Sequence, residues 1–407
     1  MDAIACHARE DAEVPHREDR PSSCLKMLLP TSFAAPVRVR SIAPVPLEMP
    51  LGRSVSTPMA TISNQVSLLV HACDEDGVEG WGEVWCNFPR FGIRHRARLL
   101  SEVLAPALVG RSFASPVDAW THATAFSNVL RLQSGESGPI AAVIAGVDIA
   151  LWDIAAKRAG QPLWRVLGGT LGRVPVYASI GRADDVLPVV ERCLGEGFRA
   201  FKVHSTGMVA EHLAAVRPLR AMIGDACELM LDVNASWDAE TAIATVGQLA
   251  GERLSWLEEP IPADAPAATW RRLAAVAPMP LAGGENLLTP AMIDDAFATD
   301  ALSVMQPDIT KWGGFSGALP VARRAVADGR RFCPHMFSGA PGVLAAAHLL
   351  AASGSRDGLL EYPVGRNPAR DALLGRPAAN GVLDLGEAPG LGLDVDLERL
   401  APFLIEA

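Results

Sequence analysis

Eight short apolar segments alternate with helical patterns in the second half of the chain, and this repeat limits the fold more than any other feature. The segments cover 174–180, 199–205, 228–236, 254–260, 280–286, 301–308, 330–337 and 358–363. Helical patterns lie between them, for example at 239–249 and 290–297. Eight strand-plus-helix units predict a (β/α)8 barrel over 166–364, somewhat compact beside the typical length of about 250 residues.

The segment before this repeat has a different pattern of apolar and polar residues. Residues 37–84 alternate as antiparallel strands do, with a hairpin turn at Asp74–Gly77 and a loop rich in Pro, Gly and Ser after Leu47. Residues 94–133 carry helical patterns, and an apolar stripe from Ile140 to Ile154 predicts a long amphipathic helix that ends at 160–162. We therefore expect an α+β domain over 36–165, onto which the Pro- and Gly-rich tail 365–407 packs back.

Composition narrows the class of protein. The 407 residues are 49% hydrophobic and 20% charged, as in soluble globular proteins, and the net charge of −10 argues against nucleic-acid binding. Residues 1–35 lack the apolar core of a signal peptide and predict a disordered extension, and no uninterrupted apolar run predicts a membrane span. The seven cysteines form no C-x-x-C pair, which favours reduced thiols in a cytoplasmic protein.

Polar side chains end seven of the eight predicted strands. They are Lys202 and His204, Asp232 and Asn234, Glu258 and Glu259, Glu285 and Asn286, then Asp308, His335 and Glu361. Any one of them has an ordinary structural explanation, such as a helix N-cap, a solvated turn or a buried histidine with satisfied hydrogen bonds. Their regular recurrence at the same end of successive strands instead predicts an active site, because the active sites of these barrels lie at the C-terminal ends of the strands.

Three of these residues, Asp232, Glu258 and Glu285, are carboxylates from adjacent strands. Carboxylates that converge without a positive charge repel one another, and a hard divalent cation removes this repulsion. Mg²⁺ prefers oxygen ligands, whereas no Cys or His stands at the spacing typical of a zinc site. The sequence therefore predicts a Mg²⁺ site on these three residues.

Basic groups are predicted on both sides of that site. Lys202 and His204 share one face of their strand, and Asp308 and His335 lie across the barrel. An Asp beside a His orients the ring and makes it a general base. This arrangement suits removal of the proton α to a carboxylate, with the cation stabilising the resulting enediolate and a protonated Glu361 donating a hydrogen bond to it.

With these residues placed, the chain from Val37 to about Ala407 resembles the enolase superfamily, mandelate racemase subgroup. The resemblance is carried by "GVDIALWDIAAKRAGQPLWRVLGG", "LDVNASWD", "WLEEP", "GGEN", "QPDITKWGG" and "CPHMF". It implies a modified TIM barrel whose mouth is covered by an α+β capping domain with two mobile loops near 47–60 and 85–95. It also implies metal on Asp232, Glu258 and Glu285, an Asp308–His335 dyad on one face and a Lys202-x-base pair on the other.

One position departs from the pattern of the subgroup, which is Lys-x-Lys, because this chain has Lys202-Val-His204. The resemblance implies that the second position transfers the proton while Lys202 contacts the substrate carboxylate. A histidine titrates near neutrality and can serve, but it reaches less far than a lysine. The alternative is that His204 donates a hydrogen bond to the substrate while His335 is the only base.

The favoured activity is dehydration of a sugar acid to a 2-keto-3-deoxy acid, as a hydro-lyase. The alternatives are a racemase or epimerase of an α-hydroxy acid and, less favoured, a non-catalytic barrel that only binds a ligand. Candidate substrate-binding residues are Asn234, Lys311, Arg53 and Arg90, although the two arginines alone are equally explained as solvated loop charges. The expected partner is a small carboxylate rather than nucleic acid or membrane, and the resemblance implies a homo-oligomer, either a dimer or an octamer.

Overall fold

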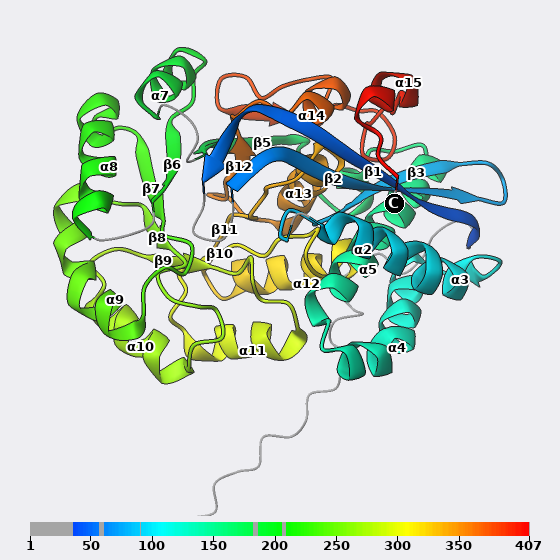
Figure 1. Ribbon diagram of the computed structural model, residues 1–407, viewed down its shortest axis with the longest axis horizontal. Helices are drawn as coiled ribbons and strands as arrows, with labels where there is room; N and C mark the ends of the chain where they lie inside the picture. Colours follow the sequence, from blue (N-terminus) through cyan, green and yellow to red (C-terminus); the bar gives the residue numbers. More distant parts are fainter. Residues whose placement is uncertain (1–35, 57–60, 90, 182–185, 206–208, 407) are drawn as a thin grey trace, which may run out of the picture.

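Two sheets organise the chain in the computed structural model, which describes residues 36–56, 61–89, 91–181, 186–205 and 209–406 (Figure 1). An antiparallel sheet with its helices comes first along the chain. A parallel sheet, curled and ringed by helices on its outer side, follows it (Figure 1). The predicted extension 1–35 lies outside the described residues.

The parallel sheet contains all eight predicted strands. They are β5 (Arg173–Ile180), β6 (Ala200–His204), β7 (Glu228–Asp232), β8 (Trp256–Glu258), β9 (Leu281–Gly283), β10 (Val304–Met305), β11 (Arg331–Phe332) and β12 (Leu360–Pro363). Their order is β11-β10-β9-β8-β7-β6-β5-β12, and β13 (Val382–Asp384) adds to β5 antiparallel. No backbone ladder joins β11 to β12 in the described part of the chain, and the Leu359 amide instead donates to the Cys333 Sγ at 3.4 Å. The (β/α)8-type fold is confirmed.

Helices cover the outer face of this sheet. They are α6 (Leu163–Val166), α7 (Val186–Gly195), α8 (Val209–Ile223), α9 (Ala239–Thr245), η2 (Val246–Glu252), α10 (Ala267–Val276), α11 (Pro290–Thr299), α12 (Gly314–Ala327) and α13 (Ala340–Ser353). The tail adds α14 (Pro368–Leu373), α15 (Leu397–Leu400) and η3 (Ala401–Phe403), and α14 and η3 contact β1 of the first sheet. Polar caps start several of them; for example, the Asp238 side chain accepts from the Thr241 amide. Inside the barrel, Tyr177, Met230 and Trp256 belong to a separate buried cluster. The barrel interior is therefore packed with side chains, not hollow.

The first sheet has the order β3-β2-β1-β4. Its elements are β1 (Val37–Ser56), β2 (Thr61–Asp74), β3 (Glu79–Val84), β4 (Ser112–Phe113), α2 (Gly92–Arg98), η1 (Leu99–Leu104), α3 (Ala105–Leu108) and α4 (Pro116–Ser134). The hairpin turn is confirmed, since the Gly77 amide donates to the Asp74 carbonyl. The loop expected after Leu47 is wrong, because β1 continues to Ser56 with a register shift between Pro50 and Val55. Its prolines are tolerated because β4 pairs only with Val37 and Arg38, and farther along this edge the tail contributes only an isolated bridge between Leu47 and Leu404 instead of a continuous ladder.

Helix α5 (Ser137–Arg158) lies between the two sheets, and its environment differs from the prediction. We expected one apolar stripe, but its residues from Ala142 to Ala156 are all buried. Packing against β3 is so close that a Cβ added to Gly82 would lie 2.0 Å from the Gly146 carbonyl oxygen. By length and composition this helix could cross a membrane, but 89% of its apolar window is buried inside the protein, as in the core helix of a soluble protein.

Two buried carboxylates of the first domain bind the N-termini of barrel helices. Glu83, at the end of β3, accepts from the Gly339 and Gly342 amides of α13 at 2.6 and 3.0 Å. Asp148, on α5, accepts from the Ser316 amide of α12 at 3.0 Å and from its hydroxyl at 2.5 Å. Because α12 and α13 follow β10 and β11, the first domain holds the two helices that come after the strands of Asp308 and His335.

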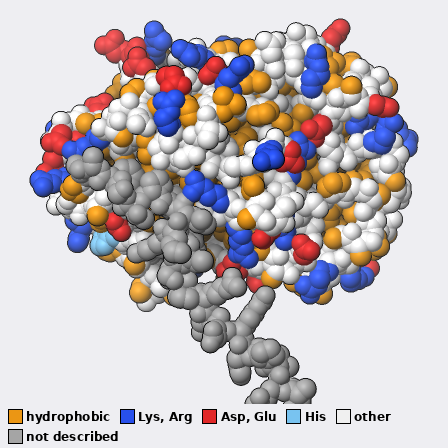
Figure 2. Space-filling model, turned by 180° about the vertical axis from the view of Figure 1, so that it is seen from behind, with side chains coloured by type: hydrophobic (Ala, Val, Ile, Leu, Met, Phe, Trp, Pro, Cys, Tyr) orange, Lys and Arg blue, Asp and Glu red, His pale blue; other side chains and the backbone are white. Residues whose placement is uncertain are grey.

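The tail returns to the first sheet, where the Ile405 amide donates to the Pro46 carbonyl at 3.1 Å. The five cysteines in the described ranges are free and buried, as expected for reduced thiols. Figure 2 shows that acidic and basic side chains are interspersed over the face turned away from Figure 1, outside the grey atoms. This pattern agrees with the acidic composition, and the exclusion of nucleic acid stays a prediction.

Candidate active site

The parallel register of the barrel brings the predicted site residues together at one end of the sheet. His204 pairs with Asp232 across β6 and β7, and Asp232 pairs with Glu258 across β7 and β8. Lys202 and His204 point to the same place, because both side chains reach Asp232, at 3.9 and 3.2 Å. The strand period of two therefore placed these side chains correctly.

Lys202 is fully buried among carboxylates. Its Nζ lies 2.5 Å from Glu258 Oε1 and 2.8 Å from Glu361 Oε1. Burial alone would lower the pKa of Lys202, but these carboxylates and Asp232 outweigh it and raise the pKa. These contacts favour the charged form of Lys202. Burial in turn raises the pKa of Glu258 to about 7, against the lowering effect of the Lys202 charge.

His204 forms the second contact of this side. Its Nδ1 lies 2.9 Å from the Ile180 carbonyl, which accepts a hydrogen bond from that nitrogen, and its Nε2 faces Asp232. Burial lowers the pKa of His204, but the hydrogen bond and charge of Asp232 raise it above its ordinary value. Asn234, the predicted substrate contact, donates from its backbone amide and its side chain to Asp232, both at 2.8 Å. It thus orients a carboxylate of the site.

Asp308 and His335 form the expected dyad on the other side. The His335 Nδ1 lies 2.8 Å from Asp308 Oδ2, and its Nε2 lies 2.5 Å from Glu285 Oε2. Burial lowers the pKa of His335, but Glu285, Glu361 and the Asp308 hydrogen bond raise it well above its ordinary value. Burial likewise raises the pKa of Glu285, yet His335 and Lys311 hold it well below its usual range. Asp308 is itself fixed by the Thr310 amide and hydroxyl, at 2.7 and 2.6 Å.

Glu361 is present in the site, but not in the protonated form that we expected. It accepts hydrogen bonds from the Ser179 hydroxyl at 2.6 Å and from the Met336 amide at 3.1 Å. Although burial raises the pKa of Glu361, Lys202 and His335 lower it below its ordinary value. The expectation of a protonated Glu361 is therefore wrong for this arrangement, because every neighbour named here favours the carboxylate.

The donor set fits a hard cation in its chemistry. Asp232, Glu258 and Glu285 supply only oxygen atoms, and the charge of Glu285 acts on the pKa of Asp232, which shows that the two carboxylates influence each other. Among the described residues, however, no group of three or more His, Cys, Asp or Glu side chains is arranged to hold an ion as it stands. The reason is that each of these carboxylates is paired with a cation of the chain itself: His204, Lys202 and His335 respectively.

Lys311 lies beside this cluster, under the first domain. Its Nζ is 3.4 Å from Glu285 Oε1, 3.2 Å from Asn286 Oδ1 and 4.5 Å from the centre of the Trp85 ring. Asn286 in turn donates to Glu285 and Glu259 at 2.9 Å. The other two predicted substrate contacts are not tested: Arg90 lies outside the described residues, and Arg53 lies in β1 with its side chain outside them.

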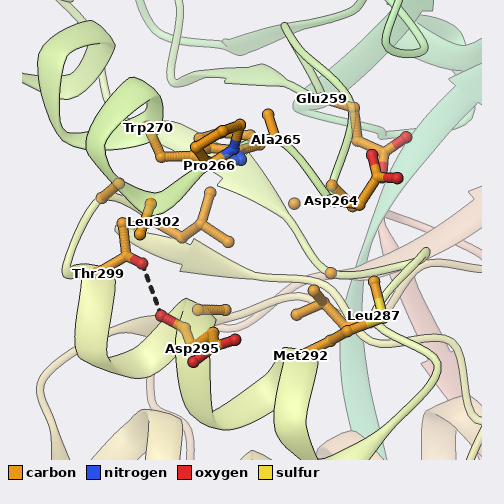
Figure 3. A pocket seen from close by; sticks show the side chains of 16 residues that line it. Glu259, Asp264, Ala265, Pro266, Trp270, Leu287, Met292, Asp295, Thr299 and Leu302 are labelled. Carbon is orange, nitrogen blue, oxygen red and sulfur yellow. Dashed lines mark hydrogen bonds between the residues drawn. The ribbon is translucent and has the colours of Figure 1, made fainter.

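A cavity of about 350 Å³ adjoins the site from outside the barrel mouth (Figure 3). Helices α10 and α11 and the neighbouring loops line it, mostly with apolar side chains such as Trp270, Leu287 and Met292 (Figure 3). Glu259 contributes to its wall and also binds Asn286. The reacting groups described above do not line this cavity, so we do not place the substrate there.

Several residues that complete the site were missed by sequence reasoning. Ser179 supplies a polar group on β5, the barrel strand for which the sequence predicted none. Trp256 and Gln306 both donate to Glu258. Trp256 could have been found from the strand period, because it precedes Glu258 by two residues on the same face of β8. Gln306 could not, because β10 ends at Met305 and Gln306 follows the strand.

Comparison with known proteins agrees with this architecture. Residues 41–168 match the mandelate racemase / muconate lactonizing enzyme N-terminal domain, and residues 186–400 match the enolase C-terminal domain-like family. The chain is 30% identical over 375 residues to D-galactarolactone cycloisomerase of Agrobacterium fabrum, covering 87% of this chain and 96% of that protein. It is 30% identical over 351 residues to D-galactonate dehydratase of Ralstonia nicotianae, covering 79% and 87%.

Solved structures show the same fold. A mandelate racemase/muconate lactonizing enzyme from Bordetella bronchiseptica is 45% identical, with a TM-score of 0.83 over 90% of this chain and 99% of that one. A racemase from Streptomyces coelicolor with bound magnesium is 27% identical, with a TM-score of 0.80 over 90% and 100%. Both family matches, the relatives and the strand-end residues lead to one conclusion: the chain is an enzyme of the enolase superfamily, in its mandelate racemase subgroup.

Proposed function

We propose that the chain removes the proton α to the carboxylate of a sugar acid and then expels a hydroxyl group from the β-carbon. The product is a 2-keto-3-deoxy acid, which makes the enzyme a hydro-lyase. The observation that carries the proposal is the Asp308–His335 dyad, whose second ring nitrogen faces Glu285 in the acidic cluster. The names of the Ralstonia dehydratase and the Agrobacterium cycloisomerase support a sugar acid as the substrate class.

His335 is the proposed general base. The bond between Nδ1 and Asp308 directs the free lone pair of the neutral ring to Nε2, which is the atom that faces the cluster. Burial lowers the pKa of His335, but Glu285 beside Nε2 raises it, which favours the protonated ring while that pairing lasts. We infer that a cation on Glu285 relieves this pairing and frees Nε2 to accept the α-proton. The protonated ring then donates a proton to the departing hydroxyl.

The other side supplies charge and a second proton-transfer group. Lys202 is the cation that meets the substrate carboxylate, and His204 is placed to exchange a proton on the opposite face of the α-carbon. Asp232, Glu258 and Glu285 would hold Mg²⁺, as their oxygen donors suggest and as a related racemase with bound magnesium makes reasonable. When bound, the ion supplies positive charge that stabilises the anion left by proton removal.

A second candidate is intramolecular elimination, in which the leaving group is a ring oxygen of a lactone or anhydro sugar. The same base and cation serve both reactions, but this product is an isomer of the substrate. The observation that favours it is the cycloisomerase of Agrobacterium fabrum, 96% of which is covered by the match. Racemisation or epimerisation, with His204 returning the proton, remains the alternative if no group leaves.

One experiment separates these reactions. The protein is incubated with Mg²⁺ in D₂O and a panel of aldonates, aldarates and their lactones, and the products are weighed by mass spectrometry. Loss of water indicates the dehydratase. A ring-opened isomer of the lactone, identical in composition apart from deuterium taken up from the solvent, indicates the cycloisomerase. Deuterium exchange at the α-carbon with neither ring opening nor loss of water indicates the racemase or epimerase. Absence of all three with every acid would contradict the proposal and favour a barrel that only binds its ligand.

Quaternary structure and location belong to the same proposal. We propose a homo-oligomer, a dimer or an octamer, that works in the cytoplasm on a small-molecule carboxylate. Light scattering coupled to gel filtration tests the first point, and a monomer would contradict it. Fractionation of cells that produce the protein tests the second.

A further inference from the structure

Glu258 is held by two neutral donors that converge on one of its oxygens. The Trp256 Nε1 donates to Glu258 Oε2 at 3.0 Å, and the Gln306 Nε2 donates to the same atom at 2.7 Å. All three side chains are at most 1% exposed. Water therefore does not compete for Oε2, whose hydrogen-bonding capacity is filled by the two donors.

Packing inside the barrel fixes the direction of the Trp256 indole. Trp256 lies two residues before Glu258 on the same face of β8, in the packed interior of the barrel. The Tyr177 ring meets its indole edge-on at 5.5 Å, and the Arg331 guanidinium lies 5.4 Å from its centre. Arg331 is itself locked by two contacts with Glu228, at 2.6 and 2.9 Å. The indole consequently has a fixed direction, toward Glu258.

The other oxygen of Glu258 has a different partner. Its Oε1 lies 2.5 Å from the Lys202 ammonium, so the carboxylate is divided into one oxygen saturated by neutral donors and one offered to a cation. Mg²⁺ accepts such single-oxygen carboxylate donors in a strict geometry, whereas Ca²⁺ readily takes both oxygens of a carboxylate. The number of Glu258 oxygens available to a metal therefore affects whether Mg²⁺ or Ca²⁺ binds more tightly.

We propose that Trp256 and Gln306 are positioning residues that make Glu258 a single-oxygen donor and so favour Mg²⁺ over Ca²⁺. This inference rests on the proposed metal site and adds that the site selects Mg²⁺ over Ca²⁺. It explains why an indole, which is costly to bury without an acceptor, stands directly beneath a carboxylate of the site. Hydrogen bonds to ligating carboxylates are also known to set metal affinity.

The test is calorimetric titration of the substrate-free protein with Mg²⁺ and, separately, with Ca²⁺. The variants are Trp256→Phe and Gln306→Met, which keep most of the volume and remove one donor each. We expect Mg²⁺ affinity to fall by about 10–100-fold in each, with a smaller loss for Ca²⁺, so that the preference for Mg²⁺ shrinks. Gln306→Met carries the test by itself should Trp256→Phe fail to fold.

Trp237 provides the matched control. It is also buried, at 3% exposure, and its Nε1 has no hydrogen-bond acceptor in the described part of the chain. Trp237→Phe should leave both affinities unchanged. If the wild-type protein binds Mg²⁺ and the Trp256 and Gln306 variants bind each ion as tightly as the wild type does, the inference is overturned while the metal site stands. A wild-type protein that binds neither ion would instead remove the metal site, and the inference with it.

Discussion

Replacing Lys202 by methionine removes the ammonium that lies among the buried carboxylates Glu258, Glu361 and Asp232. The Met side chain keeps the length of the stem, so the change is chiefly one of charge. Breaking a buried ion pair by removing one partner costs about 3–5 kcal/mol, because it leaves an uncompensated charge in the interior. We expect a loss of this size in the free energy of unfolding near neutral pH.

The pH dependence gives an independent measure of the same loss. In the wild type, Lys202 is the main influence that holds the pKa of Glu361 below its ordinary value of 4.5, so Glu361 contributes stability above that pH and loses it as the pH falls. Without Lys202, burial raises the pKa of Glu361, and stability is lost as the pH rises above 4.5. Keeping Glu361 protonated then costs at most about 1.4 kcal/mol per pH unit, or about 5 kcal/mol at about pH 8 and about 1.4 at about pH 5.5.

Urea unfolding followed by circular dichroism at these two pH values measures the effect. We expect Lys202→Met to lose most of its stability at the higher pH and little at the lower one. The double variant Lys202→Met/Glu361→Gln should lose the part of this pH dependence that Glu361 contributes, because no carboxylate titrates at position 361. The part that comes from Glu258, which also loses the Lys202 charge, should remain. Arg192→Met is the exposed control and should cost about 1 kcal/mol or less, since Arg192 and Glu196 form a surface pair. An equal loss at both pH values would refute the charge argument and point to packing.

Three further predictions concern the dyad, the contact between the domains and a buried acid. His335→Asn should lower turnover by about 10²–10⁴-fold and abolish exchange of the α-proton on its face of the substrate, whereas His204→Asn should retain that exchange. Deuterium exchange followed by NMR measures this difference. The reverse result would exchange the roles of the two histidines. Glu83→Leu should lower the free energy of unfolding, measured by urea unfolding, by about 1–3 kcal/mol, because the Gly339 and Gly342 amides and the Ser67 hydroxyl lose their buried acceptor. Glu83→Gln should lower it less. Equal stability of both variants and the wild type would contradict this prediction. Burial raises the pKa of Asp148 from 3.8 to about 7 despite hydrogen bonds from Ser316. The contribution of Asp148 to stability is therefore full below pH 3.8 and is lost as the pH rises to about 7. Asp148→Asn should flatten this part of the curve of unfolding free energy against pH, and an unchanged slope would contradict the raised pKa.

The sequence predicted the barrel and its site residues because both depend on local periodicity. Short apolar segments with a polar residue at one end can be located without knowledge of their neighbours, and Lys202 and His204 share a face simply because strands have a period of two. The parallel topology then brings the ends of all the strands together. This is why Asp232, Glu258 and Glu285 could be grouped from their positions at the ends of successive strands.

The predictions that were wrong concern features that depend on contacts between distant segments of the chain. The apolar stripe of α5 does not reveal that the first sheet and α12 bury its remaining faces as well. The Pro-, Gly- and Ser-rich stretch after Leu47 suggested a loop because the sequence does not show that β4 pairs with only the first two residues of the strand. The ionised form of Glu361 depends on its distance to Lys202 and His335, which lie on other strands and which no spacing rule provides.

The two carboxylates of the first domain that bind the starts of α12 and α13 limit how this chain can be combined with related enzymes in a chimera. Glu83 and Asp148 work only with the partners they meet, the amides at the starts of α13 and α12. At α12 the fit is so tight that a Cβ on Gly314 would lie 2.3 Å from Asp148 Oδ2. The capping domain and this half of the barrel are thus not interchangeable modules. We expect a chimera that takes its capping domain from another enzyme to need both acids and both helix starts together, because these contacts hold the helices that follow the strands of Asp308 and His335.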